Sequence, residues 1–205
     1  MQRGGLTGPH RDGWGIGFYE GRGLRLFQDP AASSESEVAR LVQRYPIKSQ
    51  TVIGHIRQAN VGKVSLANTH PFVRELWGRN WCFAHNGQLA DFQPVAGVYR
   101  PVGDTDSEAA FCALLNRLRQ TFPEPVTATE LLPELVAACS DFRRRGVFNC
   151  LLSDGDWNLG KSPITAATRR GWPMASADFL QEFLRSAGSA MQRRPRGRPR
   201  KHPPT

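Results

Sequence analysis

The chain has 205 residues, of which 40% are hydrophobic, and a formal net charge of +9. This length is enough for one soluble globular domain with a sizeable core. The charge is uneven, because residues 156–205 carry 10 Lys and Arg against 3 Asp and Glu, whereas residues 1–155 carry 17 against 15. The first 155 residues are nearly neutral, so the overall basicity does not indicate a nucleic-acid-binding domain.

Neither a membrane segment nor a metal-binding pattern stands out. No apolar run is long enough to span a bilayer, and no signal-peptide pattern follows Met1. The cysteines, Cys82, Cys112, Cys139 and Cys150, show no C-x-x-C spacing and lie in apolar segments, which is typical of reduced core thiols. We therefore expect a cytoplasmic protein without a metal or another cofactor.

The first sixty residues predict a hairpin, a helix and a strand. Residues 12–19 and 24–27 form two apolar or alternating runs around a Gly-containing loop, and glycines inside the first run indicate close backbone approach or a bulge. Ser34 and Glu37 have capping-box spacing, and the apolar stripe behind them predicts a helix over 34–45. Residues 51–57 predict a strand that is buried on both faces except at its far end.

The next strand, residues 80–85, runs directly into Asn86-Gly87. Asn-Gly is a strong turn dipeptide, so the pair taken alone favours a hairpin with a type I′ turn. A strand that ends in a side-chain amide and an unhindered backbone N–H is also a common way to build an oxyanion hole.

Two further helices are predicted. Thr105 and Glu108 repeat the capping-box spacing before an apolar stripe, which places Asp106 in the first helical turn, where the helix dipole favours a carboxylate. A third stripe covers 130–145, and Pro133 indicates that this helix begins late.

The pattern changes after residue 155. Residues 147–152 predict a last strand, so residues 1–155 read as antiparallel sheet covered by helices, an α+β architecture. Residues 156–205 have little regular patterning, and the Arg/Pro-rich end at 193–205 is expected to be disordered.

Four polar clusters lie at strand ends or loop tips, and each has an ordinary structural explanation. Arg57 could be a surface cation and His70 a satisfied loop histidine. Asn86-Gly87 could be only a turn, and Asp106 only a helix-start carboxylate. Together they are complementary, because an Arg fork binds a carboxylate, an Asp binds an ammonium, and an amide with a Gly N–H stabilises an oxyanion. These groups suit the binding of a free α-amino acid and cleavage of a bond in its side chain. The set does not include a nucleophile.

Five motifs, in order, resemble those of the class II glutamine amidotransferases, the N-terminal-nucleophile family, and in particular its stand-alone YafJ-like bacterial type. They are Asp12-Gly13-Trp14-Gly15-Ile16-Gly17, Gly54-His55-Ile56-Arg57-Gln58-Ala59-Asn60, Asn68-Thr69-His70-Pro71-Phe72, Ala84-His85-Asn86-Gly87 and Asp104-Thr105-Asp106-Ser107-Glu108. Five ordered motifs over most of residues 1–155 are far more specific than any one of them.

The resemblance implies an αββα sandwich, two antiparallel sheets between helix layers. It also implies that Arg57 binds the α-carboxylate of glutamine and that Asp106 binds its α-amino group. Asn86 and Gly87 would form the oxyanion hole through the side-chain amide and the backbone N–H.

The resemblance assigns secondary roles to three more residues. His70 would shape the site without acting as general base, and Trp14 and Gly15 would line the glutamine pocket. The ligand would be glutamine or a γ-glutamyl small molecule. The released ammonia would pass to a separate accepting protein, or would simply be the product of hydrolysis of a γ-glutamyl amide.

The sequence departs from the family at both ends. The family nucleophile is a cysteine exposed by removal of the initiator Met, with its own α-amino group as base. Here Gln2 follows Met1, and the cysteines are internal. We therefore expect a domain without the family's first strand, roughly 20–25 residues long, followed by a divergent tail from residue 156.

Three hypotheses follow. The chain is an incomplete and inactive amidotransferase, or a glutamine-binding pseudoenzyme, or a nucleic-acid-binding protein that reuses the domain. The third rests on Arg196-Gly197-Arg198-Pro199-Arg200-Lys201, which resembles an AT-hook. Such a tail is in any case expected to attract nucleic acid non-specifically and in a salt-sensitive way.

Overall fold

In a computed structural model of the chain, the structure describes residues 10–59, 62–93 and 96–156. The expectations for the tail, including its basic end at 193–205, lie outside these residues. None of the helices within the described ranges is both long enough and apolar enough to cross a membrane.

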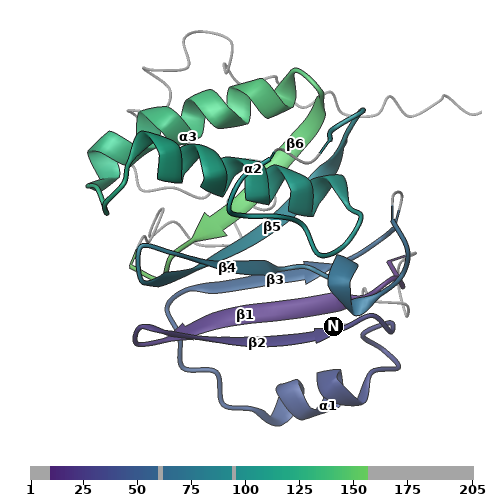
Figure 1. Cartoon of the computed structure of the whole chain (residues 1–205). Coiled ribbons are helices and arrows are strands. Elements are labelled where there is room, and N and C mark those ends of the chain that lie inside the picture. Colours follow the sequence, from purple (N-terminus) through teal and green to yellow (C-terminus); the bar gives the residue numbers. More distant parts are fainter. Residues whose placement is uncertain (1–9, 60–61, 94–95, 157–205) are drawn as a thin grey trace, which may run out of the picture.

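Two three-stranded antiparallel sheets face each other between helices (Figure 1). One sheet has the order β2-β1-β3, and the other has the order β4-β5-β6. The strands are β1 (Trp14–Glu20), β2 (Gly23–Asp29), β3 (Val52–Ile56), β4 (Phe72–Leu76), β5 (Arg79–Leu89) and β6 (Gly146–Ser153). The helices are α1 (Glu37–Arg44), the 3-10 turn η1 (Leu66–Asn68), α2 (Asp106–Thr121) and α3 (Ala128–Arg143). Helix α1 lies against the first sheet, and α2 and α3 lie on the outer side of the second. The expected α+β sandwich is confirmed.

The two faces of β5 pack against different layers. Trp81 and Phe83 face α2, where the Phe83 ring stacks on Phe111 with 4.8 Å between centroids. Cys82 and Ala84 alternate to the opposite face and pack between the two sheets. One long strand therefore joins both cores.

Gly15 allows a close backbone approach, as expected from the glycine-rich first strand. A Cβ atom built on Gly15 would lie only 2.2 Å from the carbonyl oxygen of His70. The loop that carries His70 therefore lies directly on β1, and it could not do so if residue 15 had a side chain.

The start of α1 differs from the prediction. The N-cap is Ser36 rather than Ser34, and the helix begins at Glu37. The Ser36 hydroxyl accepts from the Ala39 amide at 3.1 Å and donates to Asp29 at the end of β2. Residues 33–35 form a turn, closed by the Glu35 amide donating to the carbonyl oxygen of Ala32, so the helix begins later than the capping-box spacing indicated.

The strand and the two helices that follow are also adjusted. β3 is only partly buried, so the expectation of burial on both faces is wrong. Thr105 caps α2 as predicted, accepting from the Glu108 amide at 3.2 Å. The late start of the third helix is wrong: a complete capping box between Thr127 and Glu130 begins α3 at Ala128, with Pro133 inside the helix.

The hairpin at Asn86-Gly87 is not formed, because β5 continues through both residues to Leu89 and pairs with β6. A Cβ on Gly87 would lie 1.9 Å from the carbonyl oxygen of Val147 on β6. Glycine at this position thus allows close strand contact instead of a reversal of the chain. Gly87 and Asn86 remain exposed on the far half of β5.

Candidate active site

A cavity of about 150 Å³ lies where the end of β3, the far half of β5 and the start of α2 meet. This volume is well below the range of roughly 300–1,000 Å³ typical of drug-sized ligands, so the cavity suits a smaller molecule. Five of the residues singled out from the sequence line it, namely Arg57, His70, Asn86, Gly87 and Asp106. Its other lining residues are His10, His55, Ile56, Gln58, His85, Gln88, Thr105 and Ser107.

Arg57 follows β3 and is 4% exposed. Its Nη1 donates to the carbonyl oxygen of Lys63 at 3.1 Å, and its Nη2 donates to that of Gly62 at 3.3 Å. Burial lowers the pKa of Arg57, and the nearby carboxylates of Asp12 and Asp104 oppose this shift. Because a guanidinium remains charged in proteins, a buried cation lines the cavity and can bind an anionic ligand group.

Asp106 is the first residue of α2 and joins that helix to β5. Its Oδ2 accepts from the Leu89 amide at 2.7 Å, and its Oδ1 accepts from the Ser107 amide at 2.9 Å. A carboxylate has about four acceptor positions, so Asp106 can accept further hydrogen bonds from a ligand ammonium.

The Gly87 N–H points away from β6 and toward the cavity side. Leu89 donates to Asp106 rather than to β6, whereas Ala90 donates to Arg145 on the β6 side at 2.8 Å. Because N–H directions alternate along an antiparallel strand, the Gly87 amide shares the direction of the Leu89 amide. Among the described residues, β4 pairs with β5 only as far as Phe83, so no strand covers that side of Gly87.

His85 and Ser107 form a second link between β5 and α2, which the sequence analysis did not identify. The Ser107 Oγ lies 2.8 Å from Nδ1 of His85, and the carbonyl oxygen of Val147 lies 3.1 Å from Nε2. A carbonyl only accepts, so Nε2 carries the proton and Nδ1 accepts from the Ser107 hydroxyl. Burial lowers the pKa of His85, which favours this neutral form.

His55 and His70 both line the cavity, and their rings are tilted by 36° with 4.3 Å between ring centroids. Both nitrogens of His70 and Nδ1 of His55 are buried without a hydrogen-bond partner. Burial lowers the pKa of His55 to about 4 and that of His70 to about 2. Both rings are therefore neutral near pH 7.

Comparison with known proteins identifies the family. The model of the class-II glutamine amidotransferases matches residues 1–183. The chain belongs to the class II glutamine amidotransferases. It is 57% identical over 186 residues to the putative glutamine amidotransferase YafJ of Escherichia coli, covering 89% of this chain and 72% of that protein.

Further relatives agree with this assignment. A putative glutamine amidotransferase of Haemophilus influenzae is 45% identical over 159 residues, covering 77% of this chain and 54% of that protein. The crystal structure of a predicted glutamine amidotransferase from Pseudomonas aeruginosa superposes with a TM-score of 0.62 at 77% identity, covering 76% of this chain and 61% of that one. This amidotransferase chain thus spans only part of each relative.

Trp14 and Gly15 do not lie with the residues that line the cavity of this amidotransferase. The Trp14 side chain packs beneath α1 with Ala39 and Val42. Gly15 instead allows the loop that carries His70 to lie against β1, as described above. Gly15 therefore supports the cavity wall from behind, and Trp14 belongs to the core of the first sheet.

The cysteines of this amidotransferase are all described, and none lines the cavity. Cys82 is completely buried between the sheets, and burial raises the pKa of its thiol to about 12. Burial likewise raises the pKa of Cys112 on α2. In the part of the chain that the structure describes, no three His, Cys, Asp or Glu residues are grouped so that they could hold a metal ion.

Acid is expected to destabilise this domain through His55 and His70. Their pKa values fall from 6.5 to about 4 and about 2 on folding, so the unfolded chain binds more protons than the folded one below pH 6.5. Stability is then fully present above pH 6.5 and decreases toward pH 4, by about 1.4 kcal/mol per pH unit for each proton. Urea unfolding between pH 7.5 and 4.5 measures the slope. In a His55→Gln/His70→Gln variant, the free energy of unfolding should depend less steeply on pH. An equal slope would show that these two histidines do not cause the acid sensitivity.

Proposed function

We propose that the cavity binds glutamine or a γ-glutamyl amide by both ends of the molecule. Arg57 binds the α-carboxylate and Asp106 binds the α-ammonium. Asn86 and Gly87 face the side-chain carbonyl. The observation that carries this proposal is that a buried guanidinium and a helix-start carboxylate line one small cavity with the open half of β5.

The same arrangement suits the chemistry of amide cleavage. When a nucleophile attacks the side-chain amide, the carbonyl oxygen becomes an oxyanion, and preorganised N–H donors stabilise that charge. The Gly87 amide and the Asn86 side-chain amide supply two such donors. In a complete reaction of this class, a thiolate attacks, ammonia leaves, and water then hydrolyses the thioester to give glutamate.

The polypeptide of 205 residues is expected to bind glutamine without releasing glutamate. All its cysteines lie outside the cavity, and the most buried of them, Cys82, has a strongly raised pKa. The measurement is an enzyme-coupled glutamate assay on purified protein. Any activity must be compared with a Ser107→Ala variant, because Ser107 is the one hydroxyl paired with a histidine at the cavity. Glutamate release that persists through repurification would refute the expectation.

Calorimetry with glutamine distinguishes an incomplete, inactive amidotransferase from a glutamine-binding pseudoenzyme. Saturable binding at one site supports a glutamine-binding protein. Absence of binding by the folded chain would contradict the proposed ligand, provided that thermal unfolding shows a single cooperative transition.

A further inference from the structure

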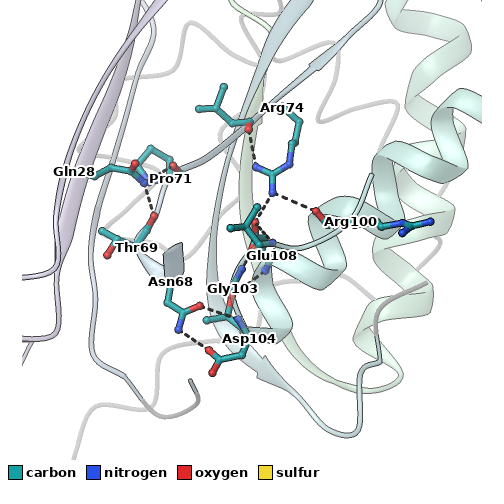
Figure 2. Close-up of polar contacts among 12 residues, drawn as sticks. Gln28, Asn68, Thr69, Pro71, Arg74, Arg100, Gly103, Asp104 and Glu108 are labelled. Atoms are coloured by element: carbon teal, nitrogen blue, oxygen red, sulfur yellow. Dashed lines mark hydrogen bonds and ion pairs between the residues drawn. The ribbon is translucent and has the colours of Figure 1, made fainter. Parts of the chain in front are cut away.

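Asn68, at the end of η1, joins two separate parts of the site. Figure 2 shows its contacts with Asp104. It is 2% exposed and does not line the cavity. Its Nδ2 donates to the carbonyl oxygen of Lys63 at 2.9 Å and to Oδ1 of Asp104 at 2.5 Å, and its Oδ1 accepts from the Asp104 amide at 3.0 Å. Three of the four hydrogen-bonding positions of the side-chain amide are therefore used.

One arm of this link reaches Arg57. The carbonyl oxygen of Lys63 that accepts from Asn68 also accepts from Nη1 of Arg57, at 3.1 Å. Asn68 thus holds the acceptor that orients the buried guanidinium. If the Lys63 carbonyl were not held, it could move with its loop and the guanidinium of Arg57 would move with it.

The other arm reaches the start of α2. Asp104 receives two contacts from Asn68, immediately precedes the N-cap Thr105, and lies two residues before Asp106. The fit is tight, because a Cβ on Gly103 would lie 2.1 Å from Oδ1 of Asn68. The backbone before α2 therefore has little room to shift relative to Asn68.

We propose that Asn68 is a positioning residue that fixes the spacing between Arg57 and Asp106. This inference rests on the proposed binding of an α-amino acid by those two residues. A ligand held at both its α-carboxylate and its α-ammonium needs that spacing. A ligand with only one of these groups can follow whichever residue moves. Asn68 thus contributes to selectivity for a free α-amino acid without touching it.

The test compares glutamine with glutaramate, which keeps the carboxylate and the amide but lacks the α-amino group. Asn68→Asp removes the donor to Lys63 and places a carboxylate against that of Asp104, so the arm to Lys63 is lost and the arm to α2 keeps only the acceptor for the Asp104 amide. Calorimetry should show glutamine binding weakened at least tenfold and glutaramate binding changed less than twofold. Equal weakening of both ligands would show a general structural role and overturn the proposal.

A matched pair of variants separates the two arms. In Asn68→Asp/Asp104→Asn the amide and the carboxylate exchange places, which restores the arm to α2 but not the arm to Lys63. Glutamine affinity should recover only in part. If Asn68→Asp does not fold, Asp104→Ala removes only the side-chain contact of the α2 arm and should weaken glutamine binding more than glutaramate binding, by a smaller factor. Unchanged selectivity in that variant would also overturn the proposal.

Amide hydrogen exchange tests the contact between Asn68 and Asp104 without any ligand. The Asp104 amide should exchange faster in Asn68→Ala, which removes its acceptor, than in the unchanged chain. An unaltered exchange rate would contradict the tether itself. If the unchanged chain fails to bind glutamine while Asn68→Ala shows this faster exchange, the proposed ligand is overturned and the tether is not, so the two failures are distinguishable.

Discussion

Arg57→Ala is expected to remove measurable glutamine binding. Truncating one partner of a buried, hydrogen-bonded charge pair typically costs about 2–5 kcal/mol. This corresponds to a Kd roughly 30-fold to several-thousand-fold weaker. Arg57 is 4% exposed and already oriented by two backbone carbonyls, so the loss should fall at the upper end. Titration calorimetry on the folded variant measures the change.

Two variants control for this substitution. Arg40→Ala removes an exposed arginine that forms an ion pair with Glu37 on the same helix, α1, and it should leave the affinity unchanged. Arg57→Lys keeps the charge but loses the planar fork, so intermediate weakening is expected. If Arg57→Ala bound glutamine as tightly as Arg40→Ala, the carboxylate would have to bind elsewhere.

Glu108→Ala is expected to be the most destabilising of the single changes considered, by roughly 3–5 kcal/mol, because it breaks a buried ion pair. Glu108 is 1% exposed and forms an ion pair with Arg74 (Figure 2). It also accepts from the amides of Val102 and Gly103 at 3.1 and 2.7 Å. Its loss leaves three donors without their acceptor. Urea unfolding monitored by tryptophan fluorescence measures the change.

An exposed pair provides the control. Glu37→Ala breaks an i,i+3 pair with Arg40 on the surface of α1, and such pairs contribute about 0–1 kcal/mol. Glu108→Gln keeps the size and one acceptor and should be less harmful than Glu108→Ala. A loss below 1 kcal/mol in Glu108→Ala would show that the segment before α2 is held by other contacts.

Local signals in the sequence located most of the elements. The cap at Thr105 and the alternating runs of β1 and β6 depend on neighbouring residues, which a sequence displays directly. One error was local as well, because the capping box between Thr127 and Glu130 begins α3 before Pro133. Contacts between distant segments caused two others. Ser36 replaced Ser34 as a cap because Asp29 holds it. The Asn86-Gly87 pair stayed in a strand because β6 approaches the glycine closely.

The same division applies to the site. Four polar clusters were found because each one lies in a loop or at an expected strand end or helix start. His55 was missed, although it lies two residues before Arg57 and thus on the same face of its strand. The roles of His85 and Asn68 depend on partners 22 and 36 residues away, Ser107 and Asp104, and no local pattern indicates them.

The far half of β5 has a consequence for association between molecules. An unpaired strand edge can recruit a strand from another copy of the protein. Among the described residues, β5 has β6 on one side and no strand on the other beyond Phe83, but the Leu89 amide is occupied by Asp106. An amide whose hydrogen bond is already made cannot donate to a strand from another copy, so at Leu89 the carboxylate of Asp106 satisfies the donor that edge-to-edge pairing would use.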